Sequence, residues 1–388
     1  MSTSKKPNRL SAFAVTAPGI ESICAAELHA LGIDAKAEDG GVAWTGDLES
    51  VARANLWLRT ASRVLVRVAE FRAKAFFELE LHAKRIPWEQ FASSGGRVAF
   101  RVTCRKSKLY HSDAVAERFA QSIKRRVPGV EMSSESDSDE APASGDTQLF
   151  VVRVFRDVCT VSADTSGALL HFRGYRQQLA KAPLRETLAA AMLLAADWHG
   201  DSSLADPMCG SGTIPIEAAL IARRIAPGRA RSFAFLRWPG EPRAMWDRLL
   251  EQAHAGELAR SPVRILGADR DAGAVDAARA NAERAGVSGD VELTQQPISA
   301  LRLEGPTSMV VTNPPYGVRV GETTALKNLY AQIGNVLQRQ PSAWTFGMLS
   351  ADPNLERHTG LALEERFRTK NGGIPVRFVT AAQAEPTL

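Results

Sequence analysis

Apolar residues recur along the chain either in short alternating runs or at helical spacing, and their order divides the chain into three parts. In residues 11–65 strand and helix patterns alternate, with one helix indicated at 20–31. This order predicts a ferredoxin-like α+β domain. Residues 66–165 continue with strands and helices and close in a hairpin that turns near Arg156 and Asp157. We interpret them as a second α+β domain.

Strands and helices alternate regularly in the last part of the chain. Residues 166–182 indicate a connector, and residues 183–388 predict a doubly wound, Rossmann-like α/β domain with a parallel sheet. Residues 226–262 interrupt the alternation and indicate an insertion beside the site of this domain. The strands expected in the sheet are 204–205, 263–269, 291–294, 309–312, 344–349 and 376–381.

A loop with two glycines follows the first strand of the α/β domain and leads into a helix. Its sequence is Asp206-Pro-Met-Cys-Gly-Ser-Gly-Thr213. Glycines let a backbone approach a ligand closely, and a helix N-terminus offers N–H groups to an anion. A P-loop lysine is absent, and Pro215 takes the third-glycine position of a dinucleotide fingerprint. A carboxylate fits the loop and an ammonium fits Asp206, so we expect an amino-acid moiety here; a tight turn without a ligand is the alternative.

Two further strands of the domain end in polar residues. The second strand ends in Asp269, and an acid at that place commonly holds ribose hydroxyls. The fourth strand, 309–311, continues into Thr312 and then into Asn313-Pro-Pro-Tyr316, which we call the NPPY motif. The Asn313 side-chain oxygen and the Pro314 carbonyl are two acceptors suited to an exocyclic –NH2 group, and Tyr316 suits stacking on a base. The alternative is a strand that ends in an ordinary proline turn.

These three features lie at the same edge of the expected sheet, because the carboxyl ends of parallel strands meet there. An amino-acid loop, a ribose acid and an amine site together indicate S-adenosylmethionine bound beside a base amine. The expected reaction is methyl transfer by in-line displacement at the sulfonium. Catalysis then depends on positioning and on polarisation of the amine, without a base of perturbed pKa.

Composition is compatible with this interpretation. The 388-residue chain carries a formal net charge of +5, which suits a nucleic-acid partner. Its cysteines have neither metal-ligand nor disulfide spacing; they are Cys24, Cys104, Cys159 and Cys209. The N-terminus lacks an apolar signal core, and no apolar run is long enough to span a bilayer. We therefore expect a cytoplasmic protein with no metal and no membrane partner.

Basic residues gather after the strand at 97–103 and in the last turn of a helix at 112–127. They are Arg101, Arg105, Lys106, Lys108, Lys124, Arg125 and Arg126. Either they form a surface for an RNA backbone, or they are a solvated face with the usual cations at a helix C-terminus. The acidic, serine-rich stretch at 133–145 has nothing to bury, and we expect a disordered surface loop there.

Taken together, the motifs resemble those of the class I RNA guanine-N2-methyltransferases that carry a THUMP domain, in particular the bacterial 23S rRNA enzymes. The segments that carry the resemblance are Asp206-Pro-Met-Cys-Gly-Ser-Gly-Thr-Ile214, Gly267-Ala-Asp269 and Asn313-Pro-Pro-Tyr-Gly317, with junction motifs similar to His171-Phe-Arg-Gly-Tyr-Arg176 and Ala182-Pro-Leu-Arg-Glu-Thr187. The resemblance implies an N-terminal ferredoxin-like domain at 11–65, a THUMP RNA-binding domain at 66–165 and a methyltransferase domain at 183–388.

The resemblance also implies roles for individual residues. The NPPY motif, Asn313, Pro314, Pro315 and Tyr316, would hold the guanine N2 amine and pack on the base. The residues expected to bind S-adenosyl-L-methionine are Asp206, Pro207, Met208, Cys209, Gly210, Gly212, Thr213, Asp269, Arg270, Gln296 and Asn313. The basic residues listed above would bind RNA, either 23S rRNA or a precursor of the large subunit.

One position departs from the family pattern. After the third strand the family usually has an acid that holds the adenine amine, whereas this chain has Pro297, so backbone groups or Gln296 are expected to take over. The alternatives are a guanine-N2-methyltransferase of transfer RNA, an adenine-N6-methyltransferase, and a non-catalytic ribosome-assembly factor. The NPPY motif does not separate the two bases, and the sequence does not give the oligomeric state.

Overall fold

The computed structural model describes residues 9–133, 146–176, 184–240, 242–304, 307–316 and 323–382. A disordered loop was expected at 133–145, and all of this stretch except Ser133 lies outside these residues, as does Pro183. The chain forms two compact units. Unit 1 comprises Met1–Thr16, Cys24–Phe172 and Gly228–Gln252, and unit 2 comprises Ala17–Ile23, Arg173–Pro227 and Ala253–Leu388.

The first part of unit 1 has the ferredoxin-like order of elements that the sequence predicts. The elements are β1 (Leu10–Val15), α1 (Glu21–Ala30), β2 (Ala35–Glu38), β3 (Gly41–Gly46), α2 (Leu48–Trp57) and β4 (Arg63–Arg72). The strands pair antiparallel in the order β2-β3-β1-β4. The prediction of a ferredoxin-like arrangement is therefore confirmed.

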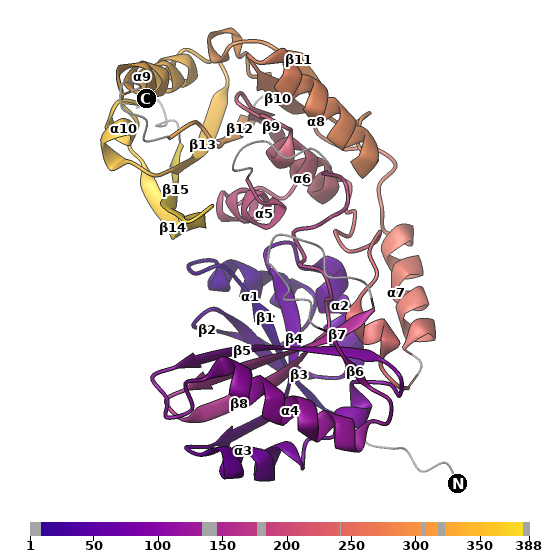
Figure 1. The fold of residues 1–388 in the computed structure, drawn as a ribbon. Helices are drawn as coiled ribbons and strands as arrows, with labels where there is room; N and C mark the ends of the chain where they lie inside the picture. The colour runs from indigo at the N-terminus through magenta and orange to yellow at the C-terminus, as the bar shows by residue number, and fades with distance from the viewer. Residues whose placement is uncertain are drawn as a thin grey trace. The chain divides into compact units, whose positions relative to one another are not determined.

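The rest of unit 1 extends the same sheet. Its elements are α3 (Phe76–Ala83), η1 (Trp88–Gln90), β5 (Arg97–Arg105), α4 (Ser112–Arg126), β6 (Glu131–Met132), β7 (Thr147–Phe155) and β8 (Val158–Asp164). β4 pairs with β8, so one eight-stranded sheet runs in the order β2-β3-β1-β4-β8-β7-β5-β6 (Figure 1). The fully buried Trp88 packs edge-on against Phe100, Phe119 and Phe150 and fills the core beside this sheet.

A segment from the second half of the sequence also belongs to unit 1. Residues 226–262 were expected as an insertion beside the site of the α/β domain, but 228–252 of them cluster with unit 1 instead. The reason is aromatic burial: Trp238 donates from Nε1 to Gln148 Oε1 at 2.8 Å, and Trp246 packs against Phe233 at 5.1 Å between ring centroids. The helices of this region are η2 (Ala234–Arg237) and α7 (Arg243–Ala255).

Unit 2 is a seven-stranded sheet in the order β11-β10-β9-β12-β13-β15-β14 (Figure 1). Its strands are β9 (Ser203–Asp206), β10 (Ile265–Asp269), β11 (Glu292–Gln295), β12 (Thr307–Thr312), β13 (Ala343–Ser350), β14 (Glu364–Asn371) and β15 (Ile374–Ala382). Its helices are α5 (Glu186–Ala195), α6 (Thr213–Ala222), α8 (Ala272–Ala285), η3 (Ile298–Ala300), α9 (Thr323–Gln338) and α10 (Pro353–Arg357).

The first five strands of this sheet are parallel, as predicted, and helices lie on both faces. β15 is antiparallel to β13, and β14 is antiparallel to β15. Alternate strand residues face opposite cores: Leu204 packs in the cluster that contains α5 and α6, and Ala205 packs in the cluster that contains α9. The doubly wound prediction is confirmed, although α9 and β14 were not predicted.

The order of strands creates a switch point between β9 and β12. The chain builds from β9 outward through β10 and β11, and then returns to the other side of β9 with β12 and β13. Connections leave these two strands in opposite directions, and in such sheets ligands bind outside the carboxyl ends of the strands at this point. Asp206 ends β9 and Thr312 ends β12 at this place.

A close contact between α9 and a neighbouring loop of unit 2 predicts that one glycine-to-alanine substitution lowers the stability of the protein. Gly334 lies inside α9, and a Cβ atom added there would stand 1.7 Å from the backbone oxygen of Thr359. Although alanine is the better helix former by about 1 kcal/mol, we expect Gly334→Ala to lower the free energy of unfolding by about 1–3 kcal/mol because the backbone must shift.

The matched control is Gly273→Ala in the exposed first turn of α8, where only the Asp271 side chain comes near, at 3.2 Å. Urea unfolding of both variants measures the difference. A Gly334→Ala protein as stable as the Gly273→Ala protein would contradict the close contact.

Candidate active site

A hydrogen bond joins the ends of the two strands at the switch point. Asp206, the last residue of β9, is 1% exposed. Its Oδ1 accepts a bond of 2.7 Å from Thr312 Oγ1 and one of 3.1 Å from the Met208 backbone N–H. The glycine loop after β9 and the NPPY motif after β12 are therefore fixed next to each other.

Burial raises the pKa of the Asp206 carboxyl to about 7. The hydrogen bonds from Thr312 and Met208 lower this pKa, and the nearby Asp269 carboxylate raises it. A cation placed beside Asp206 would stabilise the ionised form. The group is therefore suited to hold an ammonium, as the sequence indicated.

The loop at 206–213 is tied to the end of β10 by hydrogen bonds from its backbone. The Cys209 N–H donates to Ala268 O at 2.9 Å, and the Gly210 N–H donates to Asp269 Oδ2 at 3.0 Å. Gly212 has a φ of +83°, and a Cβ there would stand 2.9 Å from Ala278 Cβ, so glycine is required. α6 begins at the next residue without a side-chain cap, and its first N–H groups are suited to a carboxylate.

α8 supports this loop through residues that the sequence analysis did not single out. Asn281 is 1% exposed and donates from Nδ2 to the Ser211 carbonyl at 2.9 Å. Arg284 donates to Asn281 Oδ1 and, from Nε, to the Tyr175 carbonyl at 2.7 Å. The loop is thus tied to the chain segment that enters unit 2 at Arg173.

Asp269 ends β10 and is half-buried beside the loop. Besides the Gly210 N–H, its carboxylate accepts the Asp271 N–H at 3.0 Å. Its own carbonyl accepts the Gln296 N–H at 2.9 Å, so the half-buried Gln296 is fixed next to it. Arg270 and Pro297 are exposed.

The side-chain oxygen of Asn313 is a hydrogen-bond acceptor for which the described residues supply no donor. Its Oδ1 is buried and has no hydrogen-bond partner among the residues that the structure describes. Pro314 is buried, and Pro315 is exposed. A buried acceptor usually has a partner, because leaving it without one costs about 1–3 kcal/mol. The NPPY motif therefore holds an acceptor that suits the N–H group of a ligand.

Tyr316 is fixed by a contact that the sequence did not reveal. Its hydroxyl accepts a bond of 2.7 Å from Asn371 Nδ2, at the end of β14. The half-buried ring packs against the core of unit 2, and burial raises the pKa of the phenol. Asn371 lies far away in the sequence, with no signal to connect the two residues.

The predicted RNA-binding residues of unit 1 do not form one cluster. Arg105 ends β5 and Lys106 and Lys108 follow it, whereas 124–126 form the last turn of α4. The length of α4 separates the two groups by about 20 Å. Arg126 forms a bidentate ion pair with Glu89 at 2.7–2.8 Å, and Arg101 is half-buried within β5.

No group of three or more His, Cys, Asp or Glu side chains in the described parts of the chain is arranged to hold a metal ion. No helix among the described residues is long and apolar enough to cross a membrane.

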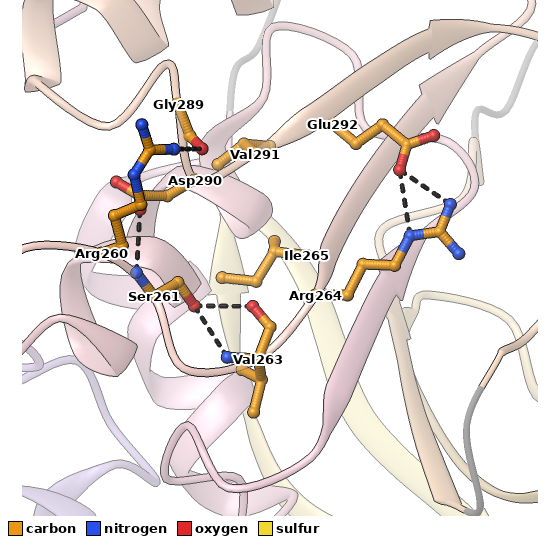
Figure 2. Close-up of a pocket in the computed structure, with 9 residues that line it drawn as sticks. All are labelled: Arg260, Ser261, Val263, Arg264, Ile265, Gly289, Asp290, Val291 and Glu292. Atoms are coloured by element: carbon orange, nitrogen blue, oxygen red, sulfur yellow. Dashed lines mark hydrogen bonds and ion pairs between the residues drawn. The ribbon is translucent and has the colours of Figure 1, made fainter.

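A separate cavity lies at the opposite edge of the unit 2 sheet. It has a volume of about 390 Å³ and is lined by residues at the amino ends of β10 and β11, among them Ile265 and Glu292 (Figure 2). Arg264 pairs with Glu292 at 2.7 Å across its rim. None of the site residues described above lines this cavity.

Comparison with known proteins places this geometry in a family. The RMKL-like methyltransferase domain matches residues 173–379, and the RlmL ferredoxin-like domain matches residues 11–65. The ribosomal RNA large subunit methyltransferase K/L of Syntrophotalea carbinolica is 38% identical over 396 residues, which cover 96% of this chain and 54% of the relative. The chain thus spans about half the length of that relative.

Other similar proteins match over nearly their whole length. The putative RNA methyltransferase slr0064 of Synechocystis sp. is 34% identical over 369 residues, 94% of each chain. The crystal structure of SMU.472, a putative methyltransferase complexed with SAH, has a TM-score of 0.87 and 30% identity and covers 99% of this chain and 100% of that one. The chain belongs to the family of RMKL-like methyltransferases.

Proposed function

We propose that this chain transfers a methyl group from S-adenosyl-L-methionine to the exocyclic N2 amine of a guanosine in RNA, in 23S rRNA or its precursor. The observation that carries the proposal is the buried Oδ1 of Asn313, which has no hydrogen-bond partner among the described residues. It belongs to the residue that follows Thr312, whose hydroxyl bonds Asp206 of the glycine loop. Family membership, the rRNA named for the K/L relative and the SAH bound to SMU.472 support the proposal.

The residues at the sheet edge fit this cofactor. Asp206 would hold the ammonium, the N–H groups at the start of α6 the carboxylate, and Asp269 the ribose hydroxyls. Gln296 and nearby backbone groups would take the adenine in place of the usual acid. The remaining cofactor-binding residues are Pro207, Met208, Cys209, Gly210, Gly212, Thr213 and Arg270. When bound, the cofactor supplies a methyl group on a sulfonium, which is a good leaving group without further activation.

The NPPY motif acts on the amine. Asn313 Oδ1 and the Pro314 carbonyl accept hydrogen bonds from its two N–H groups. These bonds draw the nitrogen lone pair away from the purine ring and aim it at the methyl carbon. Neither acceptor is a base, so the proton that the nitrogen loses after transfer passes to solvent. Asn371 holds Tyr316, so that the NPPY motif, including Pro315, keeps its place beside the base.

The domain assignment belongs to the same proposal. Residues 11–65 and 66–165, the second part as a THUMP domain, would bind RNA, and residues 183–388 would carry out the chemistry in the cytoplasm. The cations after β5 and at the end of α4 would contact phosphates.

Removal of the Asn313 side-chain oxygen tests its proposed role as a hydrogen-bond acceptor for the guanine N2 amine. We expect Asn313→Ala to lower the rate constant of methyl transfer to RNA by at least about a hundredfold, because one of two acceptors for the amine is lost. Binding of S-adenosyl-L-methionine, measured by calorimetry, should change little. The control is Asn354→Ala, an exposed asparagine in α10. Equal loss of cofactor binding and transfer in Asn313→Ala would contradict the role.

The pH dependence of cofactor binding tests Asp206. With a pKa raised to about 7, the carboxylate that accepts the ammonium is lost as the pH falls. Affinity for S-adenosyl-L-methionine should therefore fall by roughly tenfold between about pH 7 and about pH 5.5. Asp206→Asn should bind weakly over the whole range without this dependence. A wild-type affinity that does not change with pH would refute an ammonium at Asp206.

A further inference from the structure

We infer that the loops at one end of the unit 1 sheet bind a single-stranded segment of RNA, with an unpaired base stacked on Tyr110. The inference rests on the proposed function, since it names the form of RNA that unit 1 engages. The surface consists of the turn between β7 and β8 and the loops after β4 and β5. Its cations are Arg72, Arg105, Lys106, Lys108, Arg153 and Arg156, and we call it the basic turn surface.

Positive charge on this surface is not neutralised within the described chain. All six cations are exposed, and none forms an ion pair with a described residue. Two nearby acids bond backbone N–H groups and not these cations: Asp157 Oδ1 accepts the Lys108 N–H at 2.8 Å, and Oε2 of Glu78 in α3 accepts the Lys74 N–H at 2.6 Å. Such a surface attracts a polyanion.

The loops are joined to one another at the turn. The Arg156 N–H donates to Arg105 O at 3.3 Å, and the Asp157 N–H donates to Ser107 Oγ at 3.1 Å. The Asp157 carbonyl accepts the Ala73 N–H at 2.9 Å. Segments from three strand ends are thus held as one surface.

This surface also stores backbone strain. Of the five described residues other than glycine with positive φ, three meet here: Lys106 at +50°, Arg156 at +51° and Asp157 at +62°. Each costs about 1–2 kcal/mol, and such positions cluster at sites of function. Lys106 and Arg156 are both exposed at positions that glycine would occupy more easily.

An exposed aromatic ring in the loop after β5 favours single-stranded RNA over a duplex. Tyr110 is 69% exposed and stacks partly on His111, at 4.1 Å between ring centroids. Phe77, in the first turn of α3, is 71% exposed and lies four residues from Ala73. A ring beside cations favours an unpaired base, because only a base outside a duplex offers its face. A phosphate-only contact would need the cations alone.

The N-terminus of α4 adds to the same loop. The helix begins at Ser112, two residues after Tyr110, and no side chain caps its first turn. Its N–H groups are available to the phosphate next to the stacked base.

Fluorescence anisotropy with the full chain tests this inference. The probes are a fluorescein-labelled single-stranded RNA of about 15 nucleotides and mixed sequence and the duplex of the same strand. We expect tighter binding of the single strand. Tyr110→Ala should weaken single-strand binding by about tenfold, whereas Tyr110→Phe should keep it. Lys106→Ala with Lys108→Ala should reduce the slope of log affinity against log salt by about 1.4.

The same assay provides a control for the loss of charge and the results that would contradict the inference. Lys36→Ala with Lys84→Ala removes two exposed cations of unit 1 outside the surface and should leave the slope unchanged. Equal binding of single strand and duplex, or Tyr110→Ala binding like the wild type, would overturn the inference. If wild-type protein binds S-adenosyl-L-methionine and methylates RNA while these variants bind RNA normally, only this inference fails. A wild type that binds no cofactor would instead refute the proposed function.

Discussion

The hydrogen bond between Thr312 and Asp206 is the constraint on which the site depends. It joins two parallel strands at the switch point, and each strand end carries a different part of the proposed chemistry. β9 leads into the loop that we propose binds an amino-acid moiety, and β12 leads into the acceptors that we propose bind an amine. Since the bond is buried and only 2.7 Å long, the two parts cannot separate without leaving a polar group unpaired.

The site also retains features that cost stability. Asn313 keeps a buried acceptor without a described partner, and burial holds the pKa of Asp206 near neutrality. In the proposed function both groups would gain a partner, an ammonium beside Asp206 and an amine beside Asn313. Costs of this kind are expected at sites of function. The surrounding structure supports them, because Asn281 fixes the loop and Asn371 fixes the NPPY motif.

Local patterns predicted most of the fold. In the α/β unit the spacing of apolar residues distinguishes strands from helices, and characteristic residues mark where each element ends. The helix 272–285 and the ends of β9 and β10 at Asp206 and Asp269 follow from such signals. Contacts between distant residues could not be predicted, as for Asn371 with Tyr316. Adjacent cations suggested one RNA surface, but the length of α4 separates them. Residues 228–252 were assigned to the wrong unit because aromatic burial, not sequence position, decides where they pack.

Transfer of labelled methyl groups from S-adenosyl-L-methionine to RNA of cells that lack this protein shows whether the chain methylates RNA and which RNA it methylates. Nucleoside mass spectrometry then identifies the product. The account predicts N2-methylguanosine in the large-subunit rRNA or its precursor particle. The same nucleoside in transfer RNA, or N6-methyladenosine, would contradict the proposed substrate but not the amine chemistry. No transfer to any RNA, together with no binding of the cofactor, would contradict the account itself and favour a non-catalytic role in ribosome assembly.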